Sequence, residues 1–274
     1  MAKIFGREQE QLQLQALVNS NQPEFVAIYG RRRVGKTYLI REYFNDNFAF
    51  YVSGMSQGDA EEQKKVFRRA LQEYGSMQSN SGDWLDLFFE LEDLLKSKVK
   101  TGGKCIIFID ELPCFDTIRS GFLNALDHFW NSWASRYSNV KLFVCGSATS
   151  WMINKLINNH GGLHNRLTAQ IHLRPFTLSE TEQYLQSKDI HFEREMIVET
   201  YMVFGGIPYY LNMLQKDESF AQTIDRIYFA PNASLHLEFN RLFASLFNSP
   251  EPYIEIIRQL SEHKQGMTRD EIAT

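Results

Sequence analysis

Cysteine is scarce in this chain of 274 residues, which contains three, at Cys105, Cys114 and Cys145. They form no Cys-x-x-Cys pair, and two of them lie in apolar runs that are typical of small core residues. The sequence therefore gives no support for a disulfide framework. Three scattered thiols fit the reducing environment of the cytoplasm, which is where we expect the protein to be.

Long apolar runs are also missing. No segment is apolar over the length needed to cross a bilayer, and the polar N-terminal residues show no signal-peptide pattern. We therefore expect no membrane partner. The net charge of −4 gives no global attraction to nucleic acid or anionic lipid, although a local basic patch stays open. A hydrophobic content of 43% at this length supplies ample material for a core, in one large or two modest domains.

The first two-thirds of the chain alternate between strand and helix patterns. Apolar runs predict strands at residues 25–29, 48–52, 105–109, 142–145 and 170–173. Helical patterns lie at residues 8–18, 36–44, 59–74, 83–98, 119–137 and 150–157. Near-continuous apolar strands that alternate with helices are typical of a parallel sheet buried on both faces. We therefore predict a doubly wound α/β domain over residues 1–175.

After residue 175 the strand patterns fade and helices dominate. Helical patterns at residues 178–187, 193–204, 208–214, 219–229 and 234–247 predict an all-helical lid over residues 176–248. A Ser-Pro-Glu-Pro linker follows, and two further helices are expected at residues 253–263 and 268–273. Two short helices cannot bury a core of their own, so residues 249–274 are either a truncated domain or a tail that packs on the lid.

Residues 30–37 fit the pattern Gly-x-x-x-x-Gly-Lys-Thr of the phosphate-binding loop of nucleoside triphosphatases. The strand before it and the helix after it are the context that this motif needs, which disfavours a chance match in a glycine-containing turn. The loop's backbone N–H groups and the positive end of the helix dipole would bind phosphate oxygens. Lys36 would reach the β- and γ-phosphates, and the Thr37 hydroxyl would ligate Mg²⁺. The residues expected to contact the nucleotide here are Gly30, Arg31, Arg32, Arg33, Val34, Gly35, Lys36, Thr37 and Tyr38.

Three adjacent arginines occupy the tip of this loop. The geometry of such a loop comes from its backbone, so the side chains of Arg31, Arg32 and Arg33 need not touch the nucleotide. They can face solvent, a partner or the lid, and a run of like charges is most often a solvated face.

A second motif lies at residues 104–111, where an apolar strand ends in Asp110-Glu111. This is the Walker B pattern. The strand would deliver Asp110 to the edge of the sheet, where its carboxylate can hold Mg²⁺ through water. Glu111 would then orient or deprotonate the attacking water, as a general base. The alternative is a buried strand that simply leaves into solvent, and the phosphate-binding loop in the same βα chain argues against it.

Two further candidates follow the later strands. Ser147 could sit between the Walker B acids and the γ-phosphate, with Thr149 as the next choice, but a helix N-cap explains a small polar residue there equally well. Arg166 precedes the fifth strand and could stabilise γ-phosphate charge, either within its own chain or on a neighbouring subunit. From spacing alone, a solvated surface arginine is the better explanation.

Two loops could contact the base. Phe5 and Arg7, in Phe-Gly-Arg-Glu, precede the first helix, and this segment could wrap over the base. Gly205-Gly206-Ile207-Pro208 begins a lid helix, where glycine allows close approach of the backbone and Pro208 suits the first helical turn. This second loop could touch the adenine or the ribose. A simple N-terminal cap and a helix-breaking turn are the plainer alternatives.

Taken in order, these motifs resemble those of the archaeal-type ATPases, which are AAA-like P-loop proteins related to the STAND and origin-recognition ATPases. The resemblance covers residues 1 to about 250, and the loop with three arginines is its most specific part. It implies a sheet in the AAA order, a helical lid, and a winged helix whose opening would be residues 249–274, cut off early. It also implies that ATP or ADP is the nucleotide, bound with Mg²⁺, and no Asn-Lys-x-Asp motif for guanine is present.

The leading hypothesis from these motifs is an ATPase that cleaves the β–γ phosphate bond and couples its nucleotide state to lid movement. A slow nucleotide-gated switch with little turnover is the first alternative, and a DNA-associated regulatory module is the second. The resemblance leaves room for a DNA or protein partner at the C-terminal region and for a nucleotide-dependent oligomer. It also strengthens Arg166 as a nucleotide-linked arginine.

Overall fold

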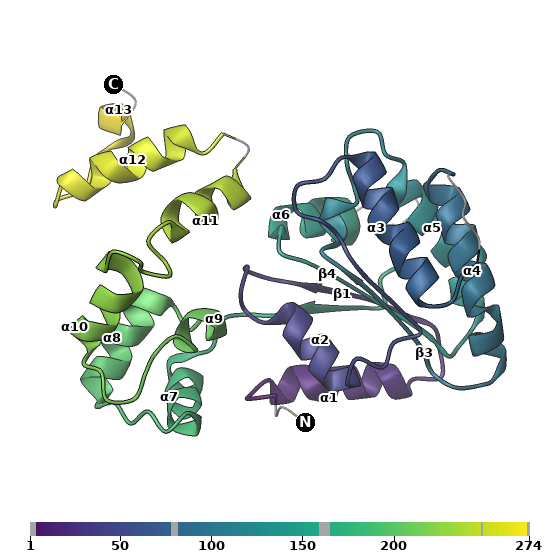
Figure 1. Cartoon of the computed structure of the whole chain (residues 1–274), viewed down its shortest axis with the longest axis horizontal. Coiled ribbons are helices and arrows are strands. Elements are labelled where there is room, and N and C mark those ends of the chain that lie inside the picture. The colour runs from purple at the N-terminus through teal and green to yellow at the C-terminus, as the bar shows by residue number, and fades with distance from the viewer. Residues whose placement is uncertain (1–3, 78–81, 159–164, 248, 273–274) are drawn as a thin grey trace. The chain divides into compact units, whose positions relative to one another are not determined.

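The structure is a computed structural model that describes residues 4–77, 82–158, 165–247 and 249–272 (Figure 1). The chain divides into two compact units. Unit 1 comprises Met1–Tyr184 together with Phe204–Leu211, and unit 2 comprises Leu185–Val203 together with Asn212–Thr274. The domain boundaries expected at residues 175 and 248 stay predictions.

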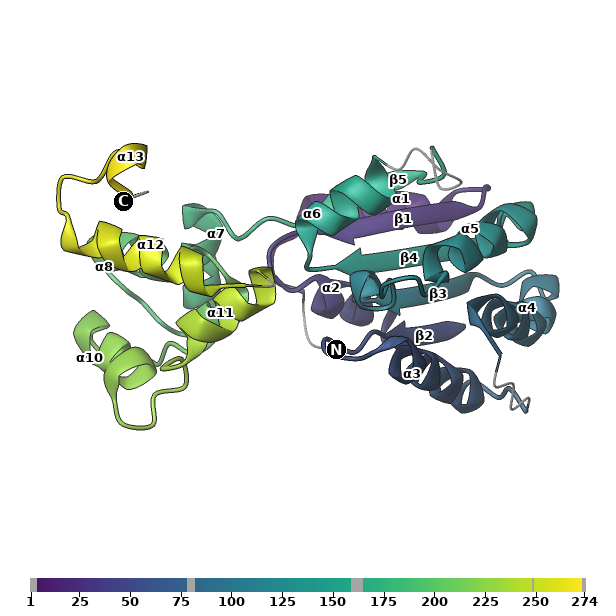
Figure 2. The ribbon, with the colours of Figure 1, turned by 90° about the horizontal axis from the view of Figure 1, so that it is seen from above.

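Unit 1 contains a five-stranded parallel sheet in the order β2-β3-β4-β1-β5 (Figure 2). Its strands are β1 (Glu24–Tyr29), β2 (Phe50–Ser53), β3 (Cys105–Asp110), β4 (Val140–Gly146) and β5 (Ala169–His172). The register pairs Phe25 of β1 with Leu142 of β4, and Val26 with Ala169 of β5. Because every pair of neighbouring strands is parallel, all five carboxyl ends lie at one edge of the sheet. The predicted α/β fold with a parallel sheet is confirmed.

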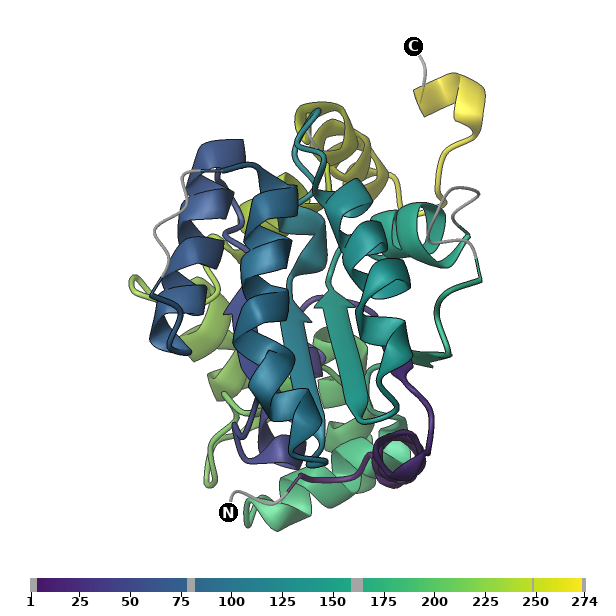
Figure 3. The same ribbon diagram turned by 90° about the vertical axis from the view of Figure 1, so that its right-hand side faces the viewer.

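Successive side chains of β1, β2, β3 and β4 enter two different hydrophobic clusters. Phe25 and Ala27 pack in the cluster with α3 (Ala60–Glu73), α4 (Trp84–Lys100) and α5 (Phe122–Ser132), which lie side by side over one face (Figure 3). Val26 and Ile28 pack in the cluster with α1 (Glu8–Asn19) and α2 (Lys36–Phe44). Burying one such side chain stabilises the fold by about 1.5–3 kcal/mol. Both faces of β1 are therefore in the core, as its unbroken apolar run predicts.

Local backbone conformation explains where the helices depart from their predicted bounds. The helix predicted at residues 119–137 begins only at Phe122, because Arg119 and Gly121 have φ values of 58° and 76° in the left-handed region. It ends at Ser132 and is followed by the 3₁₀ turn η2 (Ala134–Arg136). The helix predicted at residues 150–157 is present as α6 (Thr149–Trp151) and the π-helical turn η3 (Met152–Ile157).

The remaining elements of the chain are helical. They are α7 (Leu178–Ser187), α8 (Arg194–Phe204), α9 (Pro208–Leu211), α10 (Phe220–Ile224), the π-helical turn η4 (Asp225–Phe229), α11 (Glu238–Leu246), α12 (Glu251–Glu262) and α13 (Arg269–Ile272). Of these, α9 and the part of α7 up to Tyr184 belong to unit 1, as does Phe204 at the end of α8. In unit 2, Arg226 donates from Nε to Glu218 Oε1 at 2.6 Å and braces the turn before α10. The winged helix that the resemblance implies stays a prediction.

Within the described part of the chain, no helix combines the length and the apolar character needed to cross a bilayer.

Candidate functional site

The loop of residues 30–37 joins the end of β1 to the start of α2, at the edge of the sheet toward which the strand arrows point (Figure 2). Gly30 opens this loop with a φ of +146°, and a Cβ atom at this position would lie 2.2 Å from the carbonyl oxygen of Leu173. Leu173 directly follows β5 and donates its N–H to the Tyr29 carbonyl at 2.8 Å. The backbone after β5 thus lies against the start of the loop, and only glycine fits there.

Lys36 is the first residue of α2 and is only 5% exposed. Its Nζ donates to the carbonyl oxygens of Gly30 at 3.0 Å and Arg31 at 3.1 Å. Burial lowers the pKa of Lys36, while the charges of Glu111 and Asp110 act in the opposite direction. An ammonium group has three N–H donors, and these two bonds occupy two of them. The side chain therefore lies over its own loop with a donor available to an anion.

Thr37 and Asp110 meet at the same edge. Thr37 Oγ1 donates to Asp110 Oδ2 at 2.8 Å, and Asp110 is the last residue of β3, 3% exposed. The other oxygen of Asp110, Oδ1, accepts the N–H of Glu111 at 2.8 Å and the thiol of Cys145. These bonds fix the carboxylate in one orientation. A hydroxyl and a carboxylate oxygen this close are the hard oxygen ligands that Mg²⁺ prefers, so the pair fits this ion.

Glu111 follows directly and has a φ of 46°, which turns the chain sharply away from β3. Its Oε2 accepts the backbone N–H of Ser147 at 3.2 Å and the Ser147 hydroxyl at 3.0 Å. The end of β4 runs close to this turn, because a Cβ atom at Gly146 would lie 2.7 Å from Cδ of Pro113. Glycine at residue 146 thus allows Ser147 to reach Glu111.

The ends of three neighbouring strands therefore converge. Lys36 and Thr37 come from the element after β1, Asp110 and Glu111 from the end of β3, and Ser147 from the end of β4. Ligands of α/β sheets bind outside the carboxyl ends of the strands, at the point where the strand order reverses. The arrangement can hold a polyphosphate against the loop, with Asp110 and Glu111 at the end of β3 nearby.

Arg166 is not brought to this group of residues. It is exposed and lies three residues before β5 begins, at the opposite edge of the sheet. Within one chain it is separated from the loop by the length of the sheet. Its predicted action on a neighbouring subunit stays a prediction. Residues 159–164, which precede it closely in the sequence, lie outside the described residues.

The predicted N-terminal residues lie against the side of the loop. The guanidinium of Arg7, which is buried, donates from Nη2 to the carbonyl of Val34 at 3.4 Å and lies 4.7 Å from the ring centre of Phe176. The Phe5 ring packs edge-on against Phe176, with ring centres 6.0 Å apart. Tyr38 is exposed in the first turn of α2. Phe5, Arg7 and Tyr38 are thus all within unit 1.

The Gly-Gly-Ile-Pro segment also reaches the loop. The backbone carbonyl of Gly206 accepts the N–H of Phe176 at 2.8 Å, and Pro208 begins α9. The two tyrosines after Pro208 contact the loop directly: the Arg33 guanidinium lies 4.3 Å from the ring centre of Tyr209 and donates to the Tyr210 hydroxyl at 3.2 Å. Arg31 and Arg32, in contrast, have exposed side chains.

Sequence reasoning missed four residues that contact the site: Cys145, Phe176, Tyr209 and Tyr210. Tyr209 and Tyr210 follow Pro208 directly, so their place in the glycine–proline motif was a signal that could have suggested them. Cys145 stands at the end of a predicted strand, as Asp110 does. This shared position could have suggested that the two residues lie close together. No pattern along the chain pairs Phe176 with Arg7, because that contact depends on the tertiary fold.

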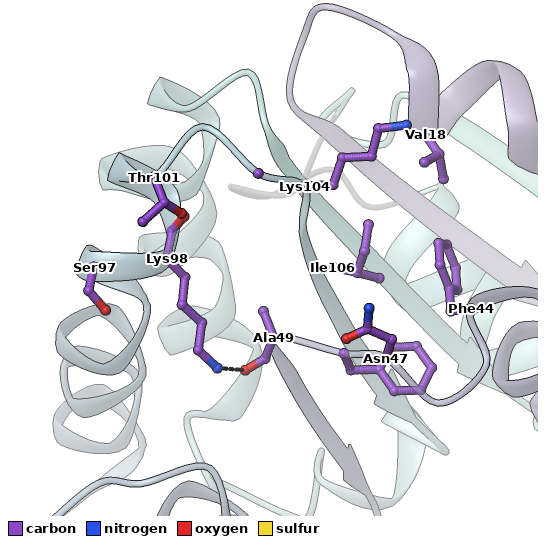
Figure 4. A pocket seen from close by; sticks show the side chains of 11 residues that line it. Val18, Phe44, Asn47, Ala49, Ser97, Lys98, Thr101, Lys104 and Ile106 are labelled. Atoms are coloured by element: carbon purple, nitrogen blue, oxygen red, sulfur yellow. Dashed lines mark hydrogen bonds between the residues drawn. The ribbon is translucent and has the colours of Figure 1, made fainter.

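A hollow of about 490 Å³ lies at the other edge of the sheet, where the strands begin (Figure 4). Val18, Phe44 and Lys98, which line it, belong to the last turns of α1, α2 and α4. Helix C-termini carry partial negative charge, and the Lys98 ammonium already donates to the carbonyl of Ala49 at 2.8 Å. Three such helix ends disfavour a polyphosphate, whereas the loop edge offers a helix N-terminus. The hollow is therefore not the phosphate site.

A family model described as an ATPase domain predominantly from Archaea matches residues 4–214 of this chain. An uncharacterized protein of Methanocaldococcus jannaschii is 29% identical over 262 residues, which cover 93% of this chain and 53% of that protein. The chain thus spans about half the length of this relative.

Two solved structures share the fold. A Walker-type ATPase of Pyrococcus abyssi superposes with a TM-score of 0.66 at 19% identity, over 98% of this chain and 87% of that one. A STAND protein with a tetratricopeptide repeat sensor, from Pyrococcus horikoshii, gives a TM-score of 0.51 at 19% identity, over 99% of this chain and 36% of that one. With the family match over residues 4–214, the chain belongs to the family of ATPase domains found predominantly in Archaea.

Proposed function

We propose that the protein binds ATP with Mg²⁺ at the loop of residues 30–37 and hydrolyses its β–γ phosphate bond. The observation that carries this proposal is the 2.8 Å contact between Thr37 Oγ1 and Asp110 Oδ2. It joins the hydroxyl of the phosphate-binding loop to the acid of the Walker B strand, the pair expected to hold the ion. When bound, Mg²⁺ would neutralise charge on the β- and γ-phosphate oxygens.

Lys36 would supply the cation at the phosphates. Two of its three N–H donors are bonded to carbonyls of the loop, which supports a role for the third in binding a phosphate oxygen. The backbone N–H groups of the loop and the N-terminus of α2 would bind the remaining oxygens. These groups bind phosphate electrostatically. Most of the catalytic effect would come from holding their charges and dipoles in place around the transferred phosphate.

Glu111 would act on the attacking water. Its carboxylate is next to the metal-binding acid in sequence and is oriented by two hydrogen bonds from Ser147. A carboxylate held in place can orient a water molecule and accept its proton as the oxygen attacks the γ-phosphorus. Ser147 would link Glu111 to the γ-phosphate. Arg166 is the candidate for added positive charge in an oligomer.

Phe5, Arg7, Tyr38 and Pro208 would form the surroundings of the base. Phe5 and Arg7 lie against one side of the loop, and Pro208 begins the helix whose tyrosines contact Arg33. Aromatic and prolyl side chains suit the face of a purine. Adenine is inferred from family membership. Movement of the lid with nucleotide state, and a DNA or protein partner at the C-terminal region, are further parts of this proposal.

The test is to identify by mass the nucleotide that the purified protein retains, and then to measure phosphate release from ATP in a single turnover. We expect ATP or ADP, and release that requires Mg²⁺. The variant Lys36→Ala should abolish ATP binding, whereas Lys155→Ala, which removes a lysine outside the loop, should leave it unchanged. Equal ATP affinity in Lys36→Ala and in the unmodified protein would overturn the assignment of the phosphate site.

A slow nucleotide-gated switch is the second candidate. One observation favours it: Oε2 of Glu111 already accepts the amide and the hydroxyl of Ser147, so this oxygen is occupied where a water molecule would have to bind. In that case the nucleotide would set the conformation and hydrolysis would be incidental. A single-turnover rate no faster than that of ATP in buffer would favour the switch over the enzyme.

A further inference from the structure

Arg33 occupies a backbone conformation that disfavours any residue with a side chain. Its φ is +70°, in the left-handed region that glycine adopts without strain. Arginine at this place in the loop must therefore be held by contacts of its own. Its neighbours Arg31 and Arg32 have exposed side chains, whereas Arg33 is only partly exposed.

The contacts that hold it come from α9. The guanidinium lies 4.3 Å from the ring centre of Tyr209 and 5.5 Å from that of Tyr210, within the range of cation–π attraction. Arg33 Nη1 also donates to the Tyr210 hydroxyl at 3.2 Å. Tyr210 is 8% exposed, so this partner is fixed within the core of unit 1.

A second tether holds the next residue of the loop to the same region. The carbonyl of Val34 accepts from the guanidinium of Arg7, and Arg7 lies over the ring of Phe176. The backbone N–H of Phe176 donates to Gly206, two residues before α9. The tip of the loop is thus connected to the α9 segment on two sides, by Arg33 directly and by Arg7 through Phe176.

We propose that Arg33 is a positioning residue that couples phosphate occupancy of the loop to α9. A left-handed residue within a loop turns successive N–H groups toward one side, and such a concavity binds anions. The side chain that fixes this conformation is the one that Tyr209 and Tyr210 hold. Phosphate binding and the Arg33–tyrosine contact therefore favour the same backbone state, and by linkage each strengthens the other by the same factor. The contact itself is independent of the proposed function, whereas its response to nucleotide rests on it.

Substitution of Arg33 by glycine or by alanine separates the effect of its side-chain contacts from that of its left-handed backbone conformation. Arg33→Gly removes the side chain but keeps the left-handed turn, so the dissociation constant for Mg²⁺–ADP should rise only by the coupling factor, about threefold. Arg33→Ala removes the side chain and also pays the left-handed cost, so its dissociation constant should rise about tenfold. The control is Arg69→Ala, which removes an exposed arginine of α3, outside the loop, and should leave the dissociation constant unchanged.

The decisive measurement is hydrogen–deuterium exchange of the Tyr210 and Leu211 amides, which are bonded to the carbonyl of Ile207 at 3.0 and 3.1 Å. In nucleotide-free protein, Arg33→Gly should speed their exchange at least threefold, and Arg33→Lys, which keeps the cation, should lie between. Saturating Mg²⁺–ADP should slow exchange in the unmodified protein and have no effect in Arg33→Gly. Tyr210→Phe, which removes only the hydroxyl, should also speed exchange and serves if Arg33→Gly does not fold.

Equal exchange in nucleotide-free Arg33→Gly and unmodified protein would overturn the proposal, as would equal slowing by Mg²⁺–ADP in both. A protein that binds no Mg²⁺–ADP at all would instead refute the proposed function. The nucleotide-free comparison would still decide whether Arg33 holds α9, so the two failures are distinguishable.

Discussion

Thr37 Oγ1 donates a hydrogen bond to Asp110 Oδ2 across 2.8 Å, although the two residues belong to elements that are not neighbours in the sheet. Asp110 ends β3, and Thr37 stands in the first turn of the helix after β1, while β4 lies between these strands. The contact spans β4 because α2 begins above the strand ends. The sheet order β3-β4-β1 is therefore what brings the loop and the Walker B acid to one place.

The substitution Asp110→Asn tests this relationship. The amide keeps the size of the carboxylate and can still accept from Thr37, but it removes the charge that would hold Mg²⁺. We expect Mg²⁺-dependent phosphate release to fall at least about 100-fold, with ATP binding in the absence of metal retained. A titration of phosphate release against Mg²⁺ measures this effect. Asp93→Asn, on the exposed side of α4, is the control, and an unchanged Mg²⁺ dependence in Asp110→Asn would remove Asp110 from the metal site.

Glu111→Gln tests the base. The amide keeps both the size of the side chain and an oxygen for Ser147, but it cannot accept a proton from water. Turnover should fall by about 10²- to 10⁴-fold while the dissociation constant for ATP changes little. Ser147→Ala, which removes one of the two bonds to Glu111 and leaves the backbone N–H, should lose less than about tenfold. Single-turnover phosphate release decides, and a Glu111→Gln variant with full turnover would end this assignment.

The sheet was predictable because its central strands contain long apolar runs. Phe25 to Ile28 enter both clusters in alternation, so this part of β1 has no polar residue on either face. Helix ends were less predictable. Arg119 lies in the predicted helix at residues 119–137, but its left-handed conformation is a property of the folded turn and not of its helix propensity.

The residues of the candidate site also differ in how far the sequence predicts them. Lys36 and Thr37 could be predicted because their roles follow from a local motif whose geometry the backbone dictates. Asp110 could be predicted because it ends a strand. The contact of Arg33 with Tyr210 could not, since the two residues are joined only through the tertiary fold and a run of three arginines is most often a solvated face. The position of Arg166 does follow from the predicted parallel sheet, because residues just before a strand lie at the edge opposite to the loops that follow the strands.

Cys114 gives a prediction about pH. Burial, and then the charges of Glu111 and Asp110, raise the pKa of the Cys114 thiol to about 11. Its thiolate fraction at pH 8 is therefore about 100-fold lower than that of a thiol with a pKa of about 9. Alkylation by iodoacetamide, followed by peptide mass, should rise tenfold per pH unit up to pH 9.5, whereas glutathione in the same tube should level off near pH 9.

The raised pKa of Cys114 also affects the free energy of unfolding. Because the pKa of the folded thiol lies above that of the unfolded chain, the neutral thiol favours the fold below about pH 9. This contribution is lost as pH rises through about 11. A rate of Cys114 alkylation that levels off together with glutathione would contradict the raised pKa.

Gly30 gives a prediction about the free energy of unfolding. A Cβ atom there would lie 2.2 Å from the Leu173 carbonyl oxygen, so Gly30→Ala must displace either the loop or the backbone after β5. The φ of +146° adds strain for any residue with a side chain. We expect the free energy of unfolding to fall by about 2–4 kcal/mol, measured by urea denaturation, because strain and overpacking add. The matched control is Gly103→Ala, since a Cβ atom at Gly103 meets no atom within 4 Å and its φ is outside the left-handed region. Equal urea midpoints for Gly30→Ala and Gly103→Ala would show that the backbone after β5 moves away without loss of stability. The steric explanation of Gly30 would then be wrong.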